Sequence, residues 1–324
     1  MIALARVIPY SIRKREALKR RIPDHSEELP NLLEHLRMEW AGYNGEKSLD
    51  YPLGLLDADK YHIFHGLRIE EKSYTFQLDT YLLSENFSVI LDSKKWGGEV
   101  FFKLSPKQVH RSVNGTIVPM QNPIEQTKNQ QYNLKRWLAE NKLSPIPIEG
   151  YGIFNQNTIV TIDKGYYEAE KYIHKTDYLL SVIRKLETLY KTPVLTPKEL
   201  LKVKKRLLAK HTPLQKNILK TYHMEAASLK KGVFCPHCDY LGMVYKWGEW
   251  QCPSCRQKSK DAHLHALEDY YLLIGPAITN KQLREFLNLS SISVATKLLV
   301  SLNLKKTGKN KTTVYMLPDF GLTS

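Results

Sequence analysis

The chain has 324 residues, with 48 lysines and arginines against 33 aspartates and glutamates, a formal net charge of +15 and 42% hydrophobic residues. This length and apolar content suffice for two or three domains with real cores, and no stretch approaches the ~18 apolar residues that cross a bilayer. The first ten residues lack the features of a signal peptide, so we expect a cytoplasmic protein with no membrane partner, and the positive charge favours a nucleic-acid partner.

The acidic N-terminal part carries the first candidate site residue. We expect residues 1–40 to form a helical extension. Gly42 to Glu46 then predicts a flexible turn that ends in an acid, and Leu49 and Leu53 follow at helical spacing. Glu46 is a candidate metal-binding carboxylate, although a glutamate in a first helical turn is also favoured simply by the helix dipole.

Two strand-type runs, residues 75–83 and 87–94, predict a β-hairpin. In the register of a two-residue turn, Asp79 opposes Asp92 and Gln77 opposes Lys94, so all four side chains lie on one face. Opposed carboxylates repel, and a bound cation removes this conflict. Oxygen ligands suit Mg²⁺ or Mn²⁺, and the lysine could hold an attacking water or offset charge on phosphorus. The alternative is an ordinary solvent-facing hairpin.

A capped helix should follow the hairpin. Asn122 as N-cap and Pro123 in the first turn predict a helix that runs to about residue 141. Its apolar stripe begins with two amides, which are costly to bury without partners, so they are expected to face a polar site. The stripe consists of Gln126, Gln130, Leu134, Trp137 and Leu138. Gln126 could instead lie in an exposed first turn.

Over roughly residues 40–165 the order of these motifs resembles the nuclease-related domain (NERD) family of the PD-(D/E)XK nuclease superfamily. The motifs are Gly45-Glu46, Gln77-Leu78-Asp79, Asp92-Ser93-Lys94 with Trp96-Gly97-Gly98, and Asn122-Pro123 with Gln126.

The resemblance implies an α/β fold with an αβββαβ restriction-endonuclease-like core, a three- to four-stranded sheet between helices, and divalent-metal cleavage of DNA or RNA. It implies that Glu46, Asp79 and Asp92 bind the metal, Lys94 is the catalytic lysine and Gln126 is the helix glutamine, with Gln77 in support. Asp92 departs from the family, whose members commonly have glutamate there, and its shorter side chain could shift the metal.

A basic segment follows, since residues 175–231 hold 14 basic and 4 acidic side chains. Thr196 and Thr212 each begin a capping box with proline next, which predicts two helices. The first helix presents basic residues that could form a phosphate-binding surface or simply a solvated face: Lys202, Lys204, Lys205, Arg206 and Lys210.

All four cysteines lie in two C-x-x-C pairs, Cys235 with Cys238 and Cys252 with Cys255, on either side of a hairpin expected at residues 245–250. Two such pairs predict a closed structural Zn²⁺ site, a zinc ribbon, rather than a redox motif or disulfides. With four thiolates present, His237, His263 and His265 are expected to be surface or packing residues.

The C-terminal part predicts three helices, residues 264–273, from Thr279 to 287 and from Ser291 to about 302, and then a basic hairpin. This order resembles a winged-helix domain. Residues that could contact nucleic acid are Lys297, Lys306, Lys309 and Lys311. Such folds also serve as dimerisation modules.

The predicted organisation is therefore a helical extension (1–40), a nuclease-like domain (41–170), a basic helical connector (171–231), a zinc ribbon (232–260) and a winged-helix-like domain (261–324). The leading hypothesis is a Mg²⁺- or Mn²⁺-dependent nuclease, with DNA favoured over RNA and a homodimer possible. One alternative is a non-catalytic DNA-binding or regulatory protein with an inactive nuclease-like scaffold. The other is a structural or oligomerisation protein with a zinc staple.

Overall fold

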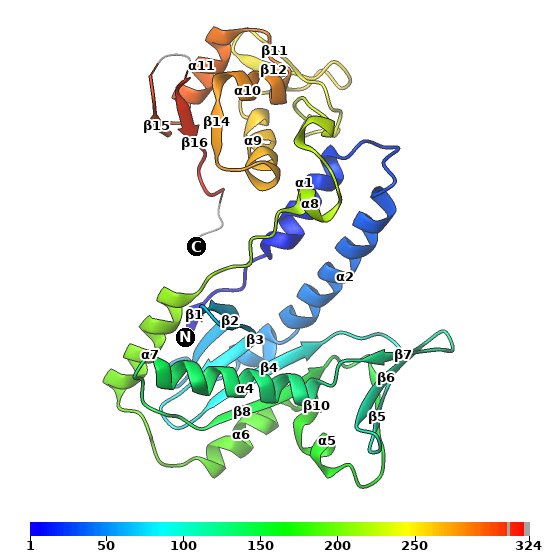
Figure 1. Cartoon of the computed structure of the whole chain (residues 1–324), viewed down its shortest axis with the longest axis vertical. Helices are drawn as coiled ribbons and strands as arrows, with labels where there is room; N and C mark the ends of the chain where they lie inside the picture. The colour runs from blue at the N-terminus through cyan, green and yellow to red at the C-terminus, as the bar shows by residue number, and fades with distance from the viewer. Residues whose placement is uncertain (310–311, 321–324) are drawn as a thin grey trace. The chain divides into compact units, whose positions relative to one another are not determined.

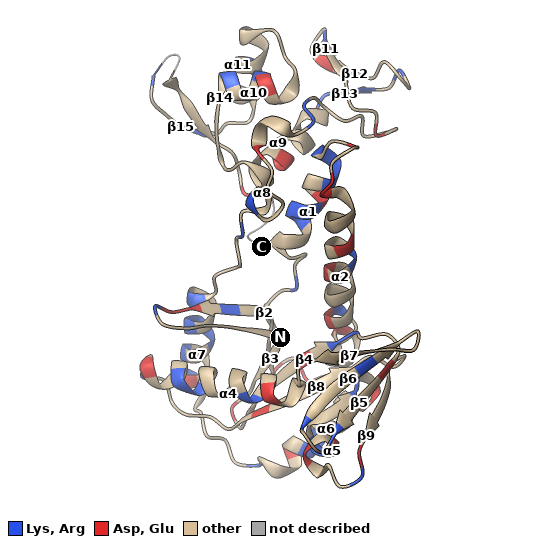
Figure 2. Ribbon diagram, turned by 45° about the vertical axis from the view of Figure 1, so that its right-hand side comes forward, with Lys and Arg blue, Asp and Glu red and all other residues tan. Residues whose placement is uncertain are grey.

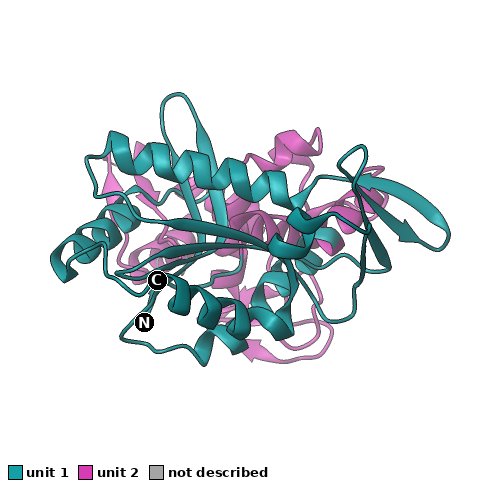
Figure 3. Ribbon diagram, turned by 90° about the horizontal axis from the view of Figure 1, so that it is seen from below, with its two compact units in different colours: residues 1–8, 38–214 teal, residues 9–37, 215–324 magenta. Residues whose placement is uncertain are grey.

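The computed structural model describes residues 1–309 and 312–320. The chain forms two compact units, which Figure 3 colours separately: residues 1–8 with 38–214, and residues 9–37 with 215–324. The segments expected as a helical extension (1–40) and a helical connector (171–231) are thus each divided between the units. None of the helices in the described ranges combines the length and apolar character that a membrane crossing requires.

The first unit is built on a six-stranded mixed sheet in the order β1-β2-β3-β4-β8-β10. The pairs β2/β3 and β3/β4 are antiparallel, and β1/β2, β4/β8 and β8/β10 are parallel. The strands are β1 (Ile2–Leu4), β2 (His62–Glu70), β3 (Thr75–Leu83), β4 (Ser88–Lys94), β8 (Ile148–Phe154) and β10 (Ile173–Lys175). The sheet is wider than the three to four strands expected, because β1 and β10 extend its two edges.

Helices cover both faces of this sheet (Figure 1). On one face, α4 (Pro123–Glu140) and α7 (Pro197–Lys210) bury apolar side chains against the strands, among them Trp137 and Leu207. On the other, α3 (Asp50–Gly54) and α6 (Leu179–Leu189) pack on residues such as Val89 and Ile153. With the C-terminal part of α2 (Leu29–Lys47), the order α2-β2-β3-β4-α4-β8 is the expected αβββαβ core, so the fold class is confirmed.

A smaller sheet follows β4 in the order β7-β6-β5-β9, and no sequence signal predicted it. Its strands and the neighbouring helix are β5 (Glu99–Lys103), β6 (Gln108–Val113), β7 (Thr116–Met120), β9 (Ile159–Ile162) and α5 (Tyr167–Tyr172). Val100 and Phe102 pack against Phe154 at the end of β8. The small sheet is therefore joined to the core next to the end of β4.

The second unit contains α1 (Tyr10–Arg21), the first part of α2, the short α8 (Ile218–Thr221) and two small sheets. One sheet follows the cysteine pairs: β11 (Val244–Lys246), β12 (Glu249–Gln251) and β13 (Lys258–Ser259). The other, in the order β14-β16-β15, packs with three helices. Its elements are α9 (Ala262–Leu273), β14 (Ala277–Thr279), α10 (Asn280–Leu287), α11 (Ile292–Ser301), β15 (Lys305–Thr307) and β16 (Val314–Met316).

Capping signals located most helix starts. The Asn122 side chain accepts from the Ile124 N–H, Thr196 forms a full capping box, and Thr279 and Ser291 cap α10 and α11. The helix predicted after Thr212 is wrong. The Thr212 N–H donates to the Arg68 carbonyl at 2.9 Å, so the chain runs along the edge of β2, and α8 begins only at Ile218.

Candidate active site and cysteine cluster

The β3–β4 hairpin has the predicted register. Thr80 pairs with Leu91 and Leu83 with Ser88, which places Asp79 beside Asp92 where the pairing of the two strands ends. Beyond that point the ladder opens, and the Ser93 N–H donates to Asp79 Oδ2 at 3.3 Å instead of to a strand carbonyl. The two aspartates thus lie where the paired strands separate.

On its other side, β3 also loses its pairing at Asp79. His65 pairs with Thr80 and Leu67 with Leu78, but Gly66, with a left-handed φ of 61°, interrupts the ladder opposite Asp79. A glycine adopts this φ without strain, and irregular strand pairing of this kind is common beside active sites. The interruption leaves the Asp79 carboxylate free of a neighbouring side chain on β2.

Lys94, Asp92 and Gln126 form one hydrogen-bonded group. Lys94 Nζ donates to Asp92 Oδ1 and to Gln126 Oε1, both at 3.0 Å, and Gln126 Nε2 donates to Asp92 Oδ1 at 2.9 Å. The Asp92 side chain is 0% exposed and that of Lys94 13%. The first turn of α4 therefore supplies an amide that is hydrogen-bonded both to the lysine and to the buried carboxylate.

Glu46 reaches the site from the last turn of α2 and is held by an arginine that the sequence reasoning missed. Arg6 donates to Glu46 Oε2 at 2.8 Å and to Asp50 Oδ1 at 2.9 Å, and it lies 2.7 Å from His65 Nδ1. Its side chain is 7% exposed. The available signal was a charged residue two positions after the apolar β1, too common a feature to single out.

The approach of α2 depends on Gly45. The sequence predicted a flexible turn at residues 42–46, but α2 continues through them to Lys47, so that expectation is wrong. A Cβ on Gly45 would lie 2.7 Å from the Lys95 Cβ. The glycine is therefore required where the helix touches the end of β4, and this contact brings Glu46 to the aspartates.

The pKa values of Glu46 and Asp92 are both raised in the folded protein. Burial and the negative charge of Asp79 raise the pKa of Glu46 to about 8, against the opposing effect of Arg6. Burial and Asp79 also raise the pKa of Asp92 to about 7, against the effect of Lys94. Carboxyl groups with raised pKa values are typical of functional sites, because burial and nearby negative charge are what such sites combine.

All three carboxylates offer the oxygen ligands that a hard divalent cation takes, but among the described residues the cysteines alone already bring their ligand atoms together. Asp92 Oδ2 is buried and lies 2.8 Å from Lys94 Nζ, yet it lacks a hydrogen bond of acceptable geometry. An unsatisfied buried carboxylate oxygen beside the carboxylate of Asp79 is what Mg²⁺ or Mn²⁺ would satisfy. The residues that could hold the ion are Glu46, Asp79 and Asp92.

The two supporting amides have different surroundings. Gln130 is buried on α4 and its Nε2 donates to the Gln77 carbonyl at 3.1 Å, while its Oε1 is buried without a partner. The Gln77 side chain itself is exposed. The structure thus joins Gln130 to the backbone of β3 and does not bring the Gln77 side chain into the hydrogen-bonded group around Lys94.

The four cysteine thiols gather in the second unit, with all Sγ atoms within 4.8 Å of one another. Cys235 and Cys255 Sγ are 3.6 Å apart, and Cys238 and Cys252 Sγ 3.7 Å. Tetrahedral Zn–S bonds of about 2.3 Å require thiol separations of about 3.8 Å. The cluster could therefore bind Zn²⁺. His263 packs beneath it, accepting from Trp250 Nε1 at 3.2 Å, while His237 and His265 are exposed.

Most of the basic residues that the sequence suggested for nucleic-acid contact are exposed. On α7, whose basic positions are coloured in Figure 2, Lys202, Lys205 and Arg206 are exposed and Lys204 is half-buried. In the second unit the exposed candidates are Lys297, Lys306 and Lys309, and Lys311 lies outside the described residues.

A comparison with known protein families agrees with the nuclease-like core of the first unit. Residues 41–155 match the family model described as nuclease-related domain (NERD), which confirms the resemblance for that segment. No curated protein matches. Among solved structures, Can2 from Sulfobacillus thermosulfidooxidans in complex with cyclic tetra-adenylate is similar at 15% identity and a TM-score of 0.27, over 54% of this chain and 50% of that chain. The chain thus spans about half the length of Can2, and at so low a TM-score we infer nothing about this protein from Can2.

Proposed function

We propose that the nuclease-related domain at residues 41–155 is an active metal-dependent nuclease that hydrolyses phosphodiester bonds, with DNA as its polymer. The observation that carries the proposal is the group formed by Lys94, Asp92 and Gln126 at the point where β3 and β4 separate. A structural lysine–aspartate pair would not need an amide to orient it or a buried carboxylate oxygen left unsatisfied.

Each residue has a distinct role in this proposal. Glu46, Asp79 and Asp92 would hold Mg²⁺ or Mn²⁺, which when bound supplies Lewis-acid charge at the phosphate and makes a bound water more acidic. Lys94 donates hydrogen bonds to a phosphate oxygen or to the attacking water, and Gln126 fixes the direction of its ammonium group. Gln130 supports β3 beneath Asp79. Water attacks phosphorus, and the P–O bond on the opposite side breaks.

The rest of the chain supports binding of a polyanion. The exposed basic residues of α7 lie on the unit that carries the site, and phosphate contacts of this kind add salt-dependent affinity without sequence preference. In the second unit, the order α9-β14-α10-α11-β15-β16 with a three-stranded antiparallel sheet supports a winged-helix-like module. A Zn²⁺ on the four thiols would stabilise the neighbouring ribbon. A cytoplasmic location, where thiols stay reduced, and a homodimer belong to the same proposal.

Cleavage of labelled single- and double-stranded DNA and RNA tests this function, with Mg²⁺, with Mn²⁺ and without added divalent cation. Lys94→Ala and Asp79→Asn should each abolish cleavage and retain nucleic-acid binding, and Lys72→Ala, which changes an exposed loop lysine, should cleave normally. Cleavage by either site variant at the wild-type rate would refute the assignment. Tight binding without cleavage by the wild-type protein would favour a non-catalytic DNA-binding protein with a nuclease scaffold.

A further inference from the structure

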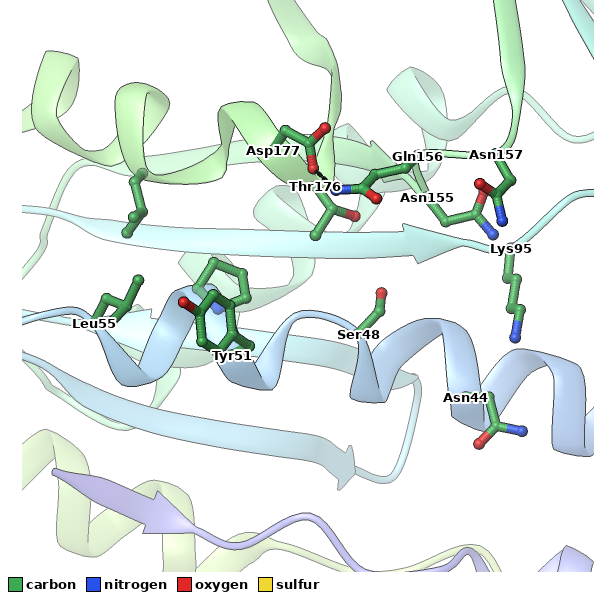
Figure 4. A pocket seen from close by; sticks show the side chains of 12 residues that line it. Asn44, Ser48, Tyr51, Leu55, Lys95, Asn155, Gln156, Asn157, Thr176 and Asp177 are labelled. Carbon is green, nitrogen blue, oxygen red and sulfur yellow. Dashed lines mark hydrogen bonds between the residues drawn. The ribbon is translucent and has the colours of Figure 1, made fainter.

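A pocket of about 440 Å³ lies beside the end of β4, where Lys95 contributes to its lining (Figure 4). Its walls come from the end of α2 with α3, from the turn after β8 and from the start of α6. The lining differs between its two ends. The polar end is formed mainly by Lys95, Asn44, Asn155 and Asn157, and the other end by Tyr51, Pro52, Leu55 and Leu180. A volume of this size is typical of small-molecule sites.

The pocket is built onto the proposed active site. The Asn155 N–H donates to the Lys94 carbonyl at 3.3 Å, so the turn that forms one wall is attached to the backbone of the proposed catalytic lysine. Lys95 follows Lys94, and its Cβ lies against Gly45, the residue before Glu46. A molecule in the polar end would therefore lie next to the scissile phosphate.

The polar end offers an unused cation and amide groups. In the part of the chain that the structure describes, Lys95 makes no hydrogen bond or ion pair, whereas Lys94 donates to Asp92 and Gln126. The lining contains one acid, Asp177, and its Oδ1 accepts a hydrogen bond from Gln156 Nε2. Lysine next to carboxamides suits a phosphate together with the polar atoms of a sugar or base.

The opposite end exposes apolar surface that the fold does not use. Tyr51 is 79% exposed and Leu55 58%, although Tyr51 lies on α3, which packs on the sheet through Leu53, and Leu55 directly follows that helix. An exposed aromatic ring beside a cationic groove is the usual platform for stacking a nucleic-acid base. Figure 4 places Tyr51 and Leu55 on one side of the pocket and Lys95 with the asparagines on the other.

We propose that this pocket binds one unpaired nucleotide of the substrate strand, next to the scissile phosphate, with its phosphate at Lys95 and its base on Tyr51. The inference rests on the proposed nuclease function. A paired base is held in the stack of a duplex and cannot enter a recessed pocket, whereas a single-stranded or flipped base can. The substrate is therefore single-stranded DNA, or DNA with a frayed end, rather than intact duplex.

Equilibrium binding tests the proposal without requiring cleavage. The probe is a fluorescein-labelled single strand of about ten nucleotides, compared with a blunt hairpin duplex, by fluorescence anisotropy in buffer without divalent cation. The wild-type protein should bind the single strand more tightly. Tyr51→Ala should weaken single-strand binding about tenfold and leave duplex binding unchanged. Lys95→Ala keeps the Cβ that contacts Gly45. It should weaken single-strand binding and lower, by about 0.7, the slope with which the logarithm of the binding constant falls with the logarithm of salt concentration.

Matched controls separate the pocket from general surface effects. Tyr167→Ala removes a tyrosine that is 76% exposed outside the pocket, and Lys72→Ala removes an exposed lysine on another loop; both should bind like wild type. Equal losses in Tyr51→Ala and Tyr167→Ala, or equal affinity of the wild type for both probes, would overturn the inference. If the protein binds single strands through Tyr51 but never cleaves, the nuclease proposal alone is refuted. If the protein cleaves, and Tyr51→Ala cuts blunt duplex as well as the wild type does and binds single strands equally tightly, the nucleotide-binding role of the pocket alone is refuted.

Discussion

Arg6 is the positive charge shared by Glu46 and Asp50. Both carboxylates accept from its guanidinium, and the side chain is nearly fully buried. Removing one partner of a buried charged group leaves the other groups desolvated without compensation. The residue therefore couples the stability of the first unit to the position of a proposed metal ligand.

We predict that Arg6→Ala lowers the free energy of unfolding by about 1–3 kcal/mol, measured by urea denaturation. A divalent cation should restore more stability to this variant than to the wild type, because it supplies positive charge to the same carboxylates. Arg6→Lys keeps the charge but loses the forked geometry, so its free energy of unfolding should lie between those of Arg6→Ala and the wild type. A variant as stable as wild type, with unchanged response to Mn²⁺, would show that the arginine is dispensable.

The raised pKa values of Glu46 and Asp92 predict how stability depends on pH. Their ordinary values are 4.5 and 3.8, and the folded protein holds them at about 8 and about 7. Between these limits the folded state keeps protons that the unfolded chain has released, so the free energy of unfolding falls as pH rises through this window.

In protein without added Mg²⁺ or Mn²⁺, urea midpoints should therefore decrease from about pH 5 to about pH 8. Glu46→Gln, which cannot ionise, should reduce that slope, and saturating Mn²⁺ should reverse it because the ionised carboxylates bind the metal. Asp163→Asn is the matched control, since hydrogen bonding to the Leu104 N–H lowers the pKa of this exposed carboxylate instead of raising it. A urea midpoint of the wild type that does not change with pH would contradict the raised pKa values of Glu46 and Asp92.

At the scale of elements, the end of α2 decides whether the site assembles. Two glycines lie in this helix, and only one touches another element: a Cβ on Gly45 meets the Lys95 Cβ at 2.7 Å, whereas a Cβ on Gly42 meets nothing within 4 Å. Alanine favours a helix over glycine by about 0.5–1 kcal/mol at either position.

Gly42→Ala should therefore raise the free energy of unfolding by about 0.5–1 kcal/mol and leave cleavage unchanged. Gly45→Ala gains the same helix propensity but pushes α2 away from β4, so it should lose cleavage and show no gain in stability. Thermal unfolding and a cleavage assay on the two variants side by side check this contrast. Full activity in Gly45→Ala would mean that the position of Glu46 is not critical.

The elements that the sequence predicted are those whose signals are local. Asn122, Thr196 and Thr279 mark helix starts because a cap needs only its own first turn. The β3–β4 register followed from alternation and a short connection, and it brought Asp79 and Asp92 together. The site-bearing hairpin and the cysteine cluster could therefore be predicted from the residues, whereas the αβββαβ core was implied by the resemblance to the family.

What escaped prediction depends on contacts between distant segments. Thr212 begins a capping box, yet its N–H pairs with Arg68 on β2, and this tertiary bond overrides the local signal. Gly42 and Gly45 suggested a turn, but α2 continues through both, and Gly45 packs against Lys95 at the end of β4. The contact of Arg6 with Glu46 spans 40 residues and leaves no periodic trace in the sequence.

At the scale of the whole molecule, each of the two units has hydrophobic cores of its own. The clusters around Trp137, Val89 and Phe102 contain only residues of the first unit, and those around Trp250 and Tyr222 only residues of the second. The cysteine cluster belongs to the second set, since Cys235 and Cys252 are buried members of the core that includes Trp250. Metal bound there would contribute to the stability of one unit only.

We predict that a strong zinc chelator selectively unfolds part of the second unit, because four thiols at these separations would protonate or repel without the ion, and structural zinc contributes about 10–16 kcal/mol in small domains. In hydrogen exchange, amides of β11, β12 and α9 should lose protection while those of β4 and β8 keep it. Cys238→Ser should reproduce this pattern without chelator, and Ser254→Ala, within the second pair but not a thiol, should not. Simultaneous loss of protection in β4 would mean that the core of the first unit also depends on the cysteine cluster.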